Sequence, residues 1–332
     1  MIVLKHILCP GDIAVMTVVP REIYRQYPGK FEIAVQTNHP DIWSGNPFIT
    51  RHFGAKATLP STAKVVKIAY DVKLAHTGRH HFMHAYLQKA VDMLKPHGIT
   101  SLPLTELRPC IQLKEEEKEA RPLRGEPYWL ICTGGKYDYT PKWWDPESWQ
   151  KLGLMLAFEP SVPRLIQVGK TDDAFHPCVK SAMDYRDRST LRNLIWLVAH
   201  SSGVICGVTM IMHLAAAFQK PCVVVAGGRE PWWWDSYDKR MLKRFLPDVP
   251  DKFKHLINTM IPHIYLDTLG KLPCCKDDGC WKASLIDKND RPCSNVVLKD
   301  KYAGPSINLA LCMKRITPTQ VLEAVMTYVK GV

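Results

Sequence analysis

The alternation of apolar strand patterns with helix patterns in the second half of the chain constrains the fold more than any other feature. Strand patterns over 128–132, 165–168, 203–206 and 222–226 are separated by helix patterns over 146–158, 191–199 and 210–218. Short apolar runs that alternate with helices in this way are typical of parallel βα units, so the sequence predicts an α/β fold with a doubly wound sheet. Ligands of such sheets bind at the carboxyl ends of the strands.

The first half of the chain shows the same alternation in a shorter form. Its strand patterns cover 3–8, 31–36 and 64–70, and its helix patterns cover 13–27 and 81–94. Residues 113–125 are rich in charged and turn-forming residues and have little to bury, which indicates a domain boundary. A chain of 332 residues is long enough for two cores.

We therefore predict four segments. Residues 1–120 and 126–270 form two α/β domains, 271–315 form a Cys-rich segment, and 316–332 form a C-terminal helix. Thr317 suits the N-cap of that helix and Pro318 suits its first position.

The charge and the apolar stretches limit the partners and the location. A net charge of +12 indicates an anionic partner, and the sequence leaves open a nucleotide diphosphate, a nucleic acid or a phosphorylated glycan. The apolar stretch 194–208 is interrupted by His200, Ser201 and Ser202, and the N-terminus lacks a signal-peptide pattern. We expect no membrane span and a cytoplasmic location, and a homo-oligomer stays open. Eleven cysteines then fit buried thiols or metal ligands better than disulfides.

The turn from strand 203–206 into helix 210–218 is a candidate phosphate site. Free backbone N–H groups at a helix start attract anions, and Thr209 beside Met210 adds a hydroxyl to them. The alternative is that Thr209 only caps a packed helix. His213 in the same helix is, taken alone, more often a structural histidine than a catalyst.

The end of strand 222–226 would lie beside that helix start in a parallel sheet. It continues as Gly227-Gly228-Arg229-Glu230, in which the glycines would let a ligand approach and the guanidinium would bind phosphate in a bidentate manner. Two neighbouring anion sites suggest a diphosphate. The three tryptophans 232–234 that follow either stack on a base or sugar or form a buried anchor.

Two further strand ends supply weaker candidates. Strand 128–132 is followed by Gly134, Gly135 and Lys136, and Lys142 leads into the next helix, so both lysines could reach phosphate oxygens. The end of strand 165–168 is a place where a base or ribose could dock, at Gln167 and Gly169. A solvated lysine is the alternative for each cation.

Asp12 follows the carboxyl end of the first predicted strand, in the sequence Pro10-Gly11-Asp12. A carboxylate at this edge could act as general base on an acceptor hydroxyl. Aspartate is also a good N-cap, and the sequence alone favours that simpler role.

The Cys-rich segment has little apolar patterning. A tetrahedral thiolate site for zinc or iron would stabilise such a segment, and disulfides or unrelated thiols are the alternatives. Cys274 and Cys275 would compete for one position, for which we prefer Cys275. The candidate ligands are Cys274, Cys275, Cys280, Cys293 and Cys312.

Several motifs resemble glycosyltransferase family 9, the heptosyltransferase-like group, and within it the metal-finger-bearing protein O-heptosyltransferases. The matching motifs are Gly11-Asp12-Ile13, Lys142-Trp143, His213-Leu214-Ala215-Ala216-Ala217, Pro221-Cys222-Val223-Val224, and the ending Cys312-Met313 through Ile316-Thr317-Pro318 to Val321. The resemblance implies a GT-B fold of two facing Rossmann-like domains, the first for the acceptor and the second for the donor. It also implies an inverting reaction in the cleft without a catalytic metal.

The resemblance assigns roles residue by residue. It makes Asp12 the base, gives Lys142 to the donor phosphate, and gives Thr209 and Met210 to phosphate binding. The family has Asp-Ser/Thr-Gly at this helix start, where the present chain has Val208-Thr209-Met210, and the family's aspartate contacts the sugar. The expected donor is therefore a nucleotide-diphosphate sugar, either ADP-heptose-like or a hexose.

The acceptor is open in this interpretation. A hydroxyl of a glycan or protein is the first expectation. The first alternative is a hydroxymethylated base in DNA, because the chain is strongly basic. The second is a non-catalytic nucleotide- or nucleic-acid-binding module, in which Val208 marks lost activity.

Overall fold

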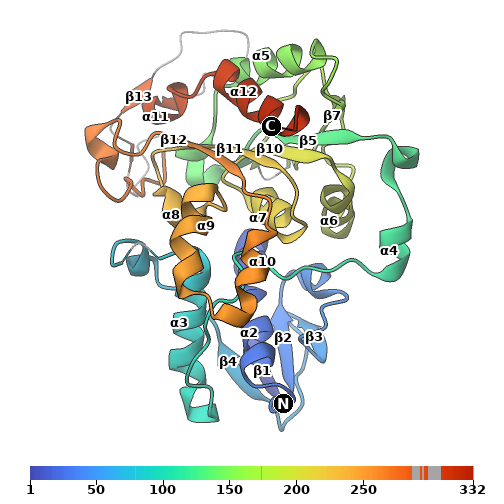
Figure 1. Ribbon diagram of the computed structural model, residues 1–332, viewed down its shortest axis with the longest axis vertical. Helices are drawn as coiled ribbons and strands as arrows, with labels where there is room; N and C mark the ends of the chain where they lie inside the picture. Colours follow the sequence, from blue (N-terminus) through green and yellow to red (C-terminus); the bar gives the residue numbers. More distant parts are fainter. Residues whose placement is uncertain (79, 173, 286–291, 294, 298–307, 332) are drawn as a thin grey trace.

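The computed structural model describes all residues except 79, 173, 286–291, 294, 298–307 and 332. Its two parallel sheets lie one above the other in Figure 1, with the N-terminus at the far end of the lower sheet. Among the described residues, no helix is long and apolar enough to cross a membrane.

The N-terminal sheet has four strands in the order β3-β2-β1-β4, all parallel. Its strands are β1 (Ile2–Lys5), β2 (Ile33–Thr37), β3 (Arg51–Gly54) and β4 (Lys64–Lys67), and its helices are α1 (Pro10–Met16), α2 (Val18–Gln26) and α3 (Phe82–Leu94). Leu4, Val35 and Val66 are paired across three of these strands and pack into one core with the helices. The strand β3 was not predicted.

The single helix expected over 13–27 is wrong, because the structure has two helices that part at Thr17. Pro20 has no N–H to donate to the carbonyl of Met16, so the hydrogen-bond ladder fails there. The hydroxyl of Thr17 instead donates to the carbonyl of Ala14 at 2.6 Å. The first helix also begins three residues earlier than expected, at Pro10.

The C-terminal sheet has six parallel strands in the order β12-β11-β10-β5-β7-β9. The strands are β5 (Tyr128–Cys132), β7 (Arg164–Gln167), β9 (Met183–Asp184), β10 (Gly203–Gly207), β11 (Cys222–Gly227) and β12 (Ile264–Asp267). This result confirms the predicted α/β class and the alternation of strands and helices in this half. The short edge strands β9 and β12 were not predicted.

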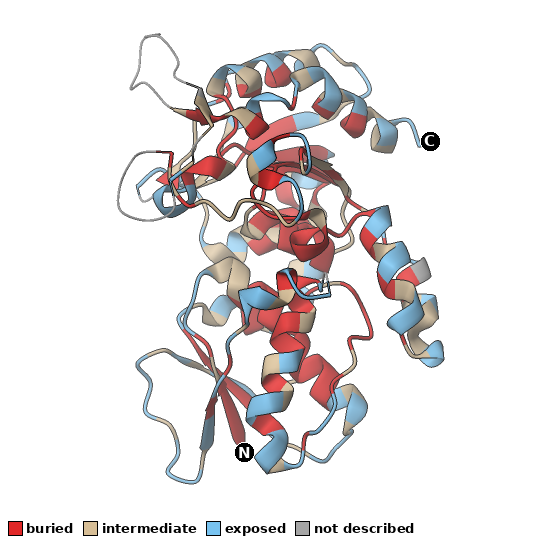
Figure 2. Ribbon diagram, turned by 90° about the vertical axis from the view of Figure 1, so that its left-hand side faces the viewer, coloured by how far each residue is buried: buried red, intermediate tan, exposed pale blue. Residues whose placement is uncertain are grey.

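Helices cover both faces of this sheet. On one face, α5 (Pro146–Ala157) and α12 (Pro318–Val329) pack against alternate strand residues such as Ile131 and Ile205. On the other face, α6 (Leu191–His200) and α7 (Met210–Ala217) belong to the core that contains Leu130 and Val204. Buried residues fill the layers between helices and sheets in Figure 2.

The last helix matches its expected start signal. Thr317 is the N-cap of α12, and it forms a capping box in which its hydroxyl accepts the Gln320 amide while the Gln320 side chain accepts the Thr317 amide.

The remaining elements connect or decorate the sheets. The helix α4 (Glu115–Glu119) lies in the charged stretch between the sheets, at the right of Figure 1. A helical excursion before β12 runs down onto α3 and α2 in that view. It consists of α8 (Trp232–Asp235), α9 (Lys239–Phe245) and α10 (Lys254–Asn258), and the other short elements are β6 (Gly135–Lys136), β8 (Ala174–Phe175), β13 (Val296–Val297), β14 (Leu309–Ala310) and α11 (Leu311–Lys314).

Candidate active site

The starts of α1 and α7 meet between the two sheets. A Cβ added to Gly11 would lie only 3.6 Å from the Cα of Met210 and 3.7 Å from the ring of His213, so the glycine allows the close approach. Asp12 is the third residue of α1. The meeting of the two helix starts therefore brings the candidate base next to the candidate phosphate site.

The simple cap interpretation of Asp12 is wrong. The N-cap of α1 is Cys9, because Pro10 takes the first helical position with its preset φ. Burial raises the pKa of Asp12, while hydrogen bonds from Tyr70 and from the Cys9 backbone and the charge of Lys142 act in the opposite direction. Tyr70 is itself held by Phe82, with ring centroids 4.5 Å apart. The half-buried Asp12 carboxylate thus has organised hydrogen-bond donors around it.

A cluster of buried and partly buried charges interacts with Asp12 through Lys142. The Lys142 ammonium is 2.6 Å from the Glu230 carboxylate, and the Arg229 guanidinium pairs with the same oxygen. Burial, together with the charge of Arg229, lowers the pKa of Lys142 to about 8. The second oxygen of Glu230 is buried and has no hydrogen-bond partner among the described residues. The structure thus brings Lys142 together with Arg229 and Glu230, which the sequence places at two different strand ends.

Asp235 completes the cluster and was missed. Its side chain is 5% exposed, and burial raises its pKa to about 6, against the charges of Lys142 and Arg229. The charge of Asp12 contributes in the same direction as burial. No local pattern distinguishes this carboxylate in the sequence, because only tertiary packing turns the end of α8 toward Lys142.

Aromatic rings border the cluster. The Arg229 guanidinium lies 4.7 Å from the centre of the Tyr139 ring and 5.9 Å from the centre of the Trp281 ring. The Lys142 ammonium is 5.7 Å from the Tyr139 ring centre. Since Tyr139 is 41% exposed, the two cations lie behind a ring that borders solvent.

The start of α7 has the expected geometry. Thr209 is the N-cap in an extended conformation, but its side chain makes no cap hydrogen bond. Gly135 packs beside it, since an added Cβ would lie 3.6 Å from the Thr209 methyl group. Lys136 reaches toward α1, with its ammonium 3.5 Å from the Cys9 sulfur. The lysine predicted at the next strand end therefore also borders the meeting point of α1 and α7.

His213 has the structural role that its position alone suggested. Its Nδ1 is 2.7 Å from the Tyr237 hydroxyl, and the residue is buried. Burial and the charge of Lys142 lower its pKa to about 3, so the imidazole is neutral at physiological pH. These contacts do not support the prediction that His213 binds the donor, because its buried ring hydrogen-bonds Tyr237.

Gln167 does not face a ligand site, contrary to prediction. Its amide nitrogen donates to the Thr133 hydroxyl at 3.0 Å and to the Pro177 carbonyl at 2.7 Å. Its amide oxygen accepts from the Val179 N–H at 2.7 Å. The whole amide is therefore consumed in joining strand β7 to the loop beside it.

Four of the predicted glycines serve packing between protein segments. A Cβ at Gly134 would collide with the Phe175 backbone, and one at Gly169 with the His176 ring. At the end of β11, side chains of the C-terminal segment fill the space that was expected for a ligand. Gly227, with φ +70°, makes room for Met313, and Gly228 makes room for Cys275.

The tryptophans 232–234 act mainly as an anchor. Trp233 and Trp234 are buried, and the Trp233 indole donates to the Ala75 carbonyl at 2.9 Å. Ala75 ends a short 3-10 helix, Val72–Ala75, that follows strand β4 of the other sheet. Trp234 packs on Phe82, with centroids 5.1 Å apart. The anchor therefore joins α8, and with it Asp235, to the N-terminal part of the chain.

The five cysteines of the C-terminal segment do not form a ready metal site. Among the described residues, no three His, Cys, Asp or Glu side chains converge in a coordinating arrangement. The thiol of Cys275, the preferred ligand, contacts the carbonyls of Leu272 and Thr268 at 3.4 and 3.5 Å, and these contacts give no support to that preference over Cys274. Cys280 lies near enough to Cys274 and Cys293 to interact with them electrostatically.

Comparison with solved structures supports the same architecture. The ADP-heptose LPS heptosyltransferase II of E. coli is 14% identical, with a TM-score of 0.61 over 99% of this chain and 98% of that one. A family 9 glycosyltransferase from Veillonella parvula is 12% identical, with a TM-score of 0.60 over 100% and 97% of the two chains. The iron-containing dodecameric TibC of enterotoxigenic E. coli is 16% identical, with a TM-score of 0.61 over 99% and 76%.

These similarities concern the fold, which fits the GT-B architecture. Comparison with curated protein sequences finds no match. A family model described as glycosyltransferase family 9 (heptosyltransferase) matches residues 61–248, more than half of the chain. That range contains Lys142, Arg229, Glu230 and Asp235 of the charged cluster, and Thr209 at the start of α7. The chain therefore belongs to glycosyltransferase family 9 and is a glycosyltransferase.

Proposed function

We propose that the protein transfers a sugar from a nucleotide-diphosphate sugar to a hydroxyl group of an acceptor, with inversion at the anomeric carbon. One observation carries the proposal: the half-buried Asp12 carboxylate, beside the meeting point of two helix starts, interacts electrostatically with Lys142, which shares the Glu230 carboxylate with the buried Arg229. A base opposite an anion site is the arrangement that this displacement needs.

The cations and the start of α7 would bind the diphosphate. One oxygen of Glu230 pairs with both cations, as a phosphate oxygen can. Donor binding would replace that carboxylate, and the buried Glu230 oxygen without a partner could then accept a hydrogen bond from a donor hydroxyl. Positive charge at this place would stabilise the negative charge that builds up on the departing diphosphate.

Asp12 would receive the proton of the acceptor hydroxyl. As the acceptor oxygen forms its bond to the anomeric carbon, the bond from that carbon to the diphosphate oxygen breaks, and the diphosphate leaves with the electron pair. Attack from the face opposite the leaving group gives inversion. Tyr70, which hydrogen-bonds Asp12, would hold the carboxylate in position.

The donor is proposed as a nucleotide-diphosphate heptose or hexose. A second TibC structure is titled as a complex with ADP-D-β-D-heptose. The Val208-Thr209-Met210 sequence at the start of α7 differs from the motif of the resembling family, so the hexose remains part of the proposal.

Substitution of the two central residues tests the chemistry. Asp12→Asn should lower kcat by about 100- to 10,000-fold, because the amide cannot accept the proton. Lys142→Ala should reduce kcat and weaken donor binding together. Release of nucleoside diphosphate from a panel of ADP- and UDP-sugars is the measurement, with the exposed Asp41→Asn and Lys151→Ala as matched controls. Full activity in both site variants would remove the proposed mechanism.

For the acceptor we propose a glycan or protein hydroxyl. DNA is a second candidate because of the net charge of +12. A salt-sensitive gel shift with duplex DNA would favour it, and absence of binding at low salt would exclude it. The non-catalytic alternative is not retained, since the chain is a glycosyltransferase.

A structural zinc or iron ion remains a separate proposal. The proposal is supported by the electrostatic interactions of Cys280 with Cys274 and Cys293. Cys312 likewise interacts with Cys280 and Cys293. Elemental analysis of purified protein tests it, with Cys280→Ser as the site variant and Cys275→Ser as the matched control. Protein free of both metals would exclude the site.

A further inference from the structure

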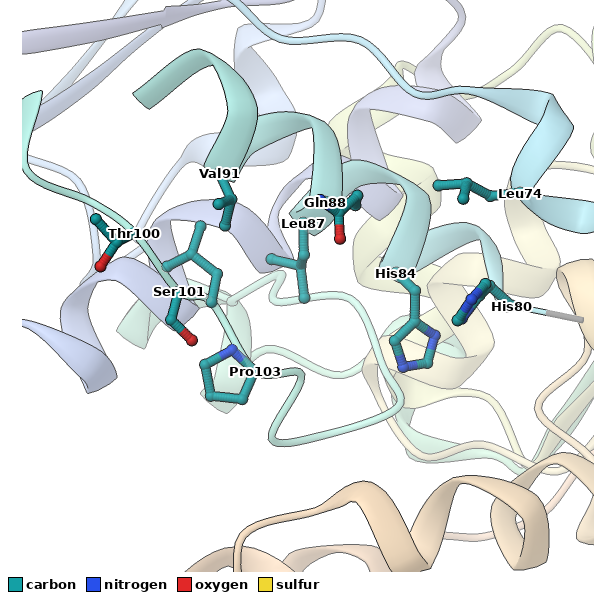
Figure 3. Close-up of a pocket in the computed structure, with 10 residues that line it drawn as sticks. Leu74, His80, His84, Leu87, Gln88, Val91, Thr100, Ser101 and Pro103 are labelled. Atoms are coloured by element: carbon teal, nitrogen blue, oxygen red, sulfur yellow. The ribbon is translucent and has the colours of Figure 1, made fainter. Parts of the chain in front are cut away.

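A cavity of about 360 Å³ lies beside α3, away from the charged cluster. Figure 3 shows His80 and His84 side by side at one end, and Thr100, Ser101 and Pro103 at the other. No Asp, Glu, Lys or Arg is among the described residues that line it. The described lining residues therefore offer no charged side chain to bind a phosphate group. The volume of the cavity lies within the range of small-ligand sites.

The walls of the cavity combine apolar and neutral polar groups. Leu87, Val91 and Leu102 supply apolar surface, and Leu87 is only 3% exposed. Gln88 and Ser101 are exposed polar side chains on the rim. An imidazole, an amide and a hydroxyl can each donate or accept a hydrogen bond, as the hydroxyl groups of a sugar do.

The loop on the far side is held in place before any ligand arrives. The Tyr27 hydroxyl accepts the backbone N–H groups of Thr100 and Ser101 at 3.0 and 3.2 Å. This anchoring fixes the two residues relative to α3. A preorganised wall loses little conformational entropy when a ligand binds.

The other end is closed by the C-terminal part of the chain. The Phe245 ring of α9 stands edge-on to His84, with centroids 5.5 Å apart, and Arg244 donates to the Gly78 carbonyl at 2.9 Å. The His84 ring interacts with the His81 backbone and lies near the Arg244 charge, so its position at this end of the cavity is fixed.

The chemistry of the lining selects the class of ligand. An anion finds no cation among the described lining residues, and an apolar ligand would leave the polar rim without water. Burial lowers the pKa of His84 to about 4, so its ring is neutral at physiological pH. A neutral ring with hydroxyl groups and an apolar face fits both kinds of wall.

We propose that this cavity binds a neutral sugar residue of the acceptor glycan, distal to the hydroxyl that is glycosylated. The opposite face of α3 carries Phe82 and Tyr86, which pack on Tyr70, the residue that hydrogen-bonds Asp12. The cavity therefore lies about one helix diameter, ~10 Å, from the catalytic face. This inference rests on the proposed transfer to a glycan.

Binding of simple sugars to the full chain tests the site directly. Saturation-transfer NMR with methyl glycosides of glucose, galactose and mannose should show binding at millimolar concentrations. The double variant Gln88→Ala/Ser101→Ala should weaken it by about tenfold, because two hydrogen bonds are lost. Gln26→Ala, at an exposed glutamine on α2, should leave binding unchanged.

Three outcomes would overturn the proposal. They are no binding of any of the three glycosides, unchanged binding in the double variant, and tighter binding of glucose 6-phosphate than of the neutral glycosides. A glycosyl-transfer assay distinguishes a failure of the cavity proposal from a failure of the proposed function. The double variant should raise KM for a glycan acceptor and leave kcat and the donor KM unchanged, whereas a wild-type protein without any transfer would contradict the proposed function alone.

Discussion

At the scale of single residues, the active site depends on carboxylates that folding places in unfavourable surroundings. Asp12 and Asp235 both have raised pKa values because burial disfavours their charged forms. Glu230 is buried as well, but two cations accompany it. These differences lead to two predictions about stability.

The first residue-scale prediction concerns pH. The folded protein raises the pKa of Asp235 from 3.8 to about 6, so it holds this proton more tightly than the unfolded chain does. Ionisation of Asp235 therefore costs stability as the pH rises through this window, and the cost is complete above it. Asp235→Asn should gain about 3 kcal/mol relative to wild type between about pH 3 and pH 8.

Urea unfolding at several pH values measures this difference. The control is Asp248→Asn, which removes a carboxylate at an exposed position. An Asp235→Asn effect that is the same at every pH would contradict the burial argument.

The second residue-scale prediction concerns Glu230. Glu230→Gln leaves Lys142 and Arg229 without their shared negative partner, which should destabilise the fold by about 3–5 kcal/mol. Added ADP should restore more stability to this variant than to wild type, because its diphosphate replaces the lost charge. Thermal shift with and without ADP measures the effect. Glu22→Gln disrupts a buried pair with Arg21 elsewhere, so ADP should not rescue it.

At the scale of secondary-structure elements, helix ends carry both stability and function. The start of α7 has no side-chain cap and faces the charged cluster, whereas the start of α12 has a complete capping box. The difference fits their roles, because uncapped N–H groups can bind an anion and capped ones stabilise the helix.

Removal of the α12 cap tests the stabilising role. Thr317→Ala should lower the free energy of unfolding by about 1 kcal/mol, since the Gln320 amide loses its acceptor. Chemical denaturation measures the change. Thr327→Ala removes a hydroxyl from the same helix away from the cap, and it should cost less. Equal losses in the two variants would show that the capping box contributes nothing.

At the scale of the whole molecule, the segment α8–α10 contacts the N-terminal half of the chain and so fixes the two sheets relative to each other. The Trp233 indole donates to Ala75, and the Arg25 guanidinium of α2 lies 5.3 Å from the Phe253 ring centre. These contacts fix Asp235 and the Arg229 region relative to Asp12. The active site therefore depends on contacts outside it.

Trp233→Phe tests this dependence. An aromatic ring is kept, but the pyrrole part of the indole and its N–H are lost, which leaves the buried Ala75 carbonyl without that donor, so stability should fall by about 1–2 kcal/mol. Donor KM should rise as well, because the cluster is less well fixed. Trp232→Phe is the matched control, because the neighbouring Trp232 ring contacts the Arg240 guanidinium and not the Ala75 carbonyl. A loss of stability without any change in donor KM would separate the anchor from the active site.

Local patterns predicted much of this fold. Strand β5 and the helices α5, α7 and α12 agree with expectation to within one residue, because their apolar periodicity and end signals are local. The two-residue strand β9, the edge strand β3 and the excursion α8–α10 escaped prediction, since short elements have little periodicity of their own. Pro20 divided one predicted helix, although its effect is local and was readable in the sequence.

The sequence by itself determined the α/β class, the order of the main elements and the turn at Thr209, since each depends on residues close together in the chain. Only the tertiary structure decided that Asp12, Lys142, Glu230 and Asp235 share one cluster, and that Gly227 and Gly228 receive protein side chains. The physical reason is packing: burial and the charge of distant neighbours set the chemistry of these groups, and neither is encoded in any short stretch of the chain.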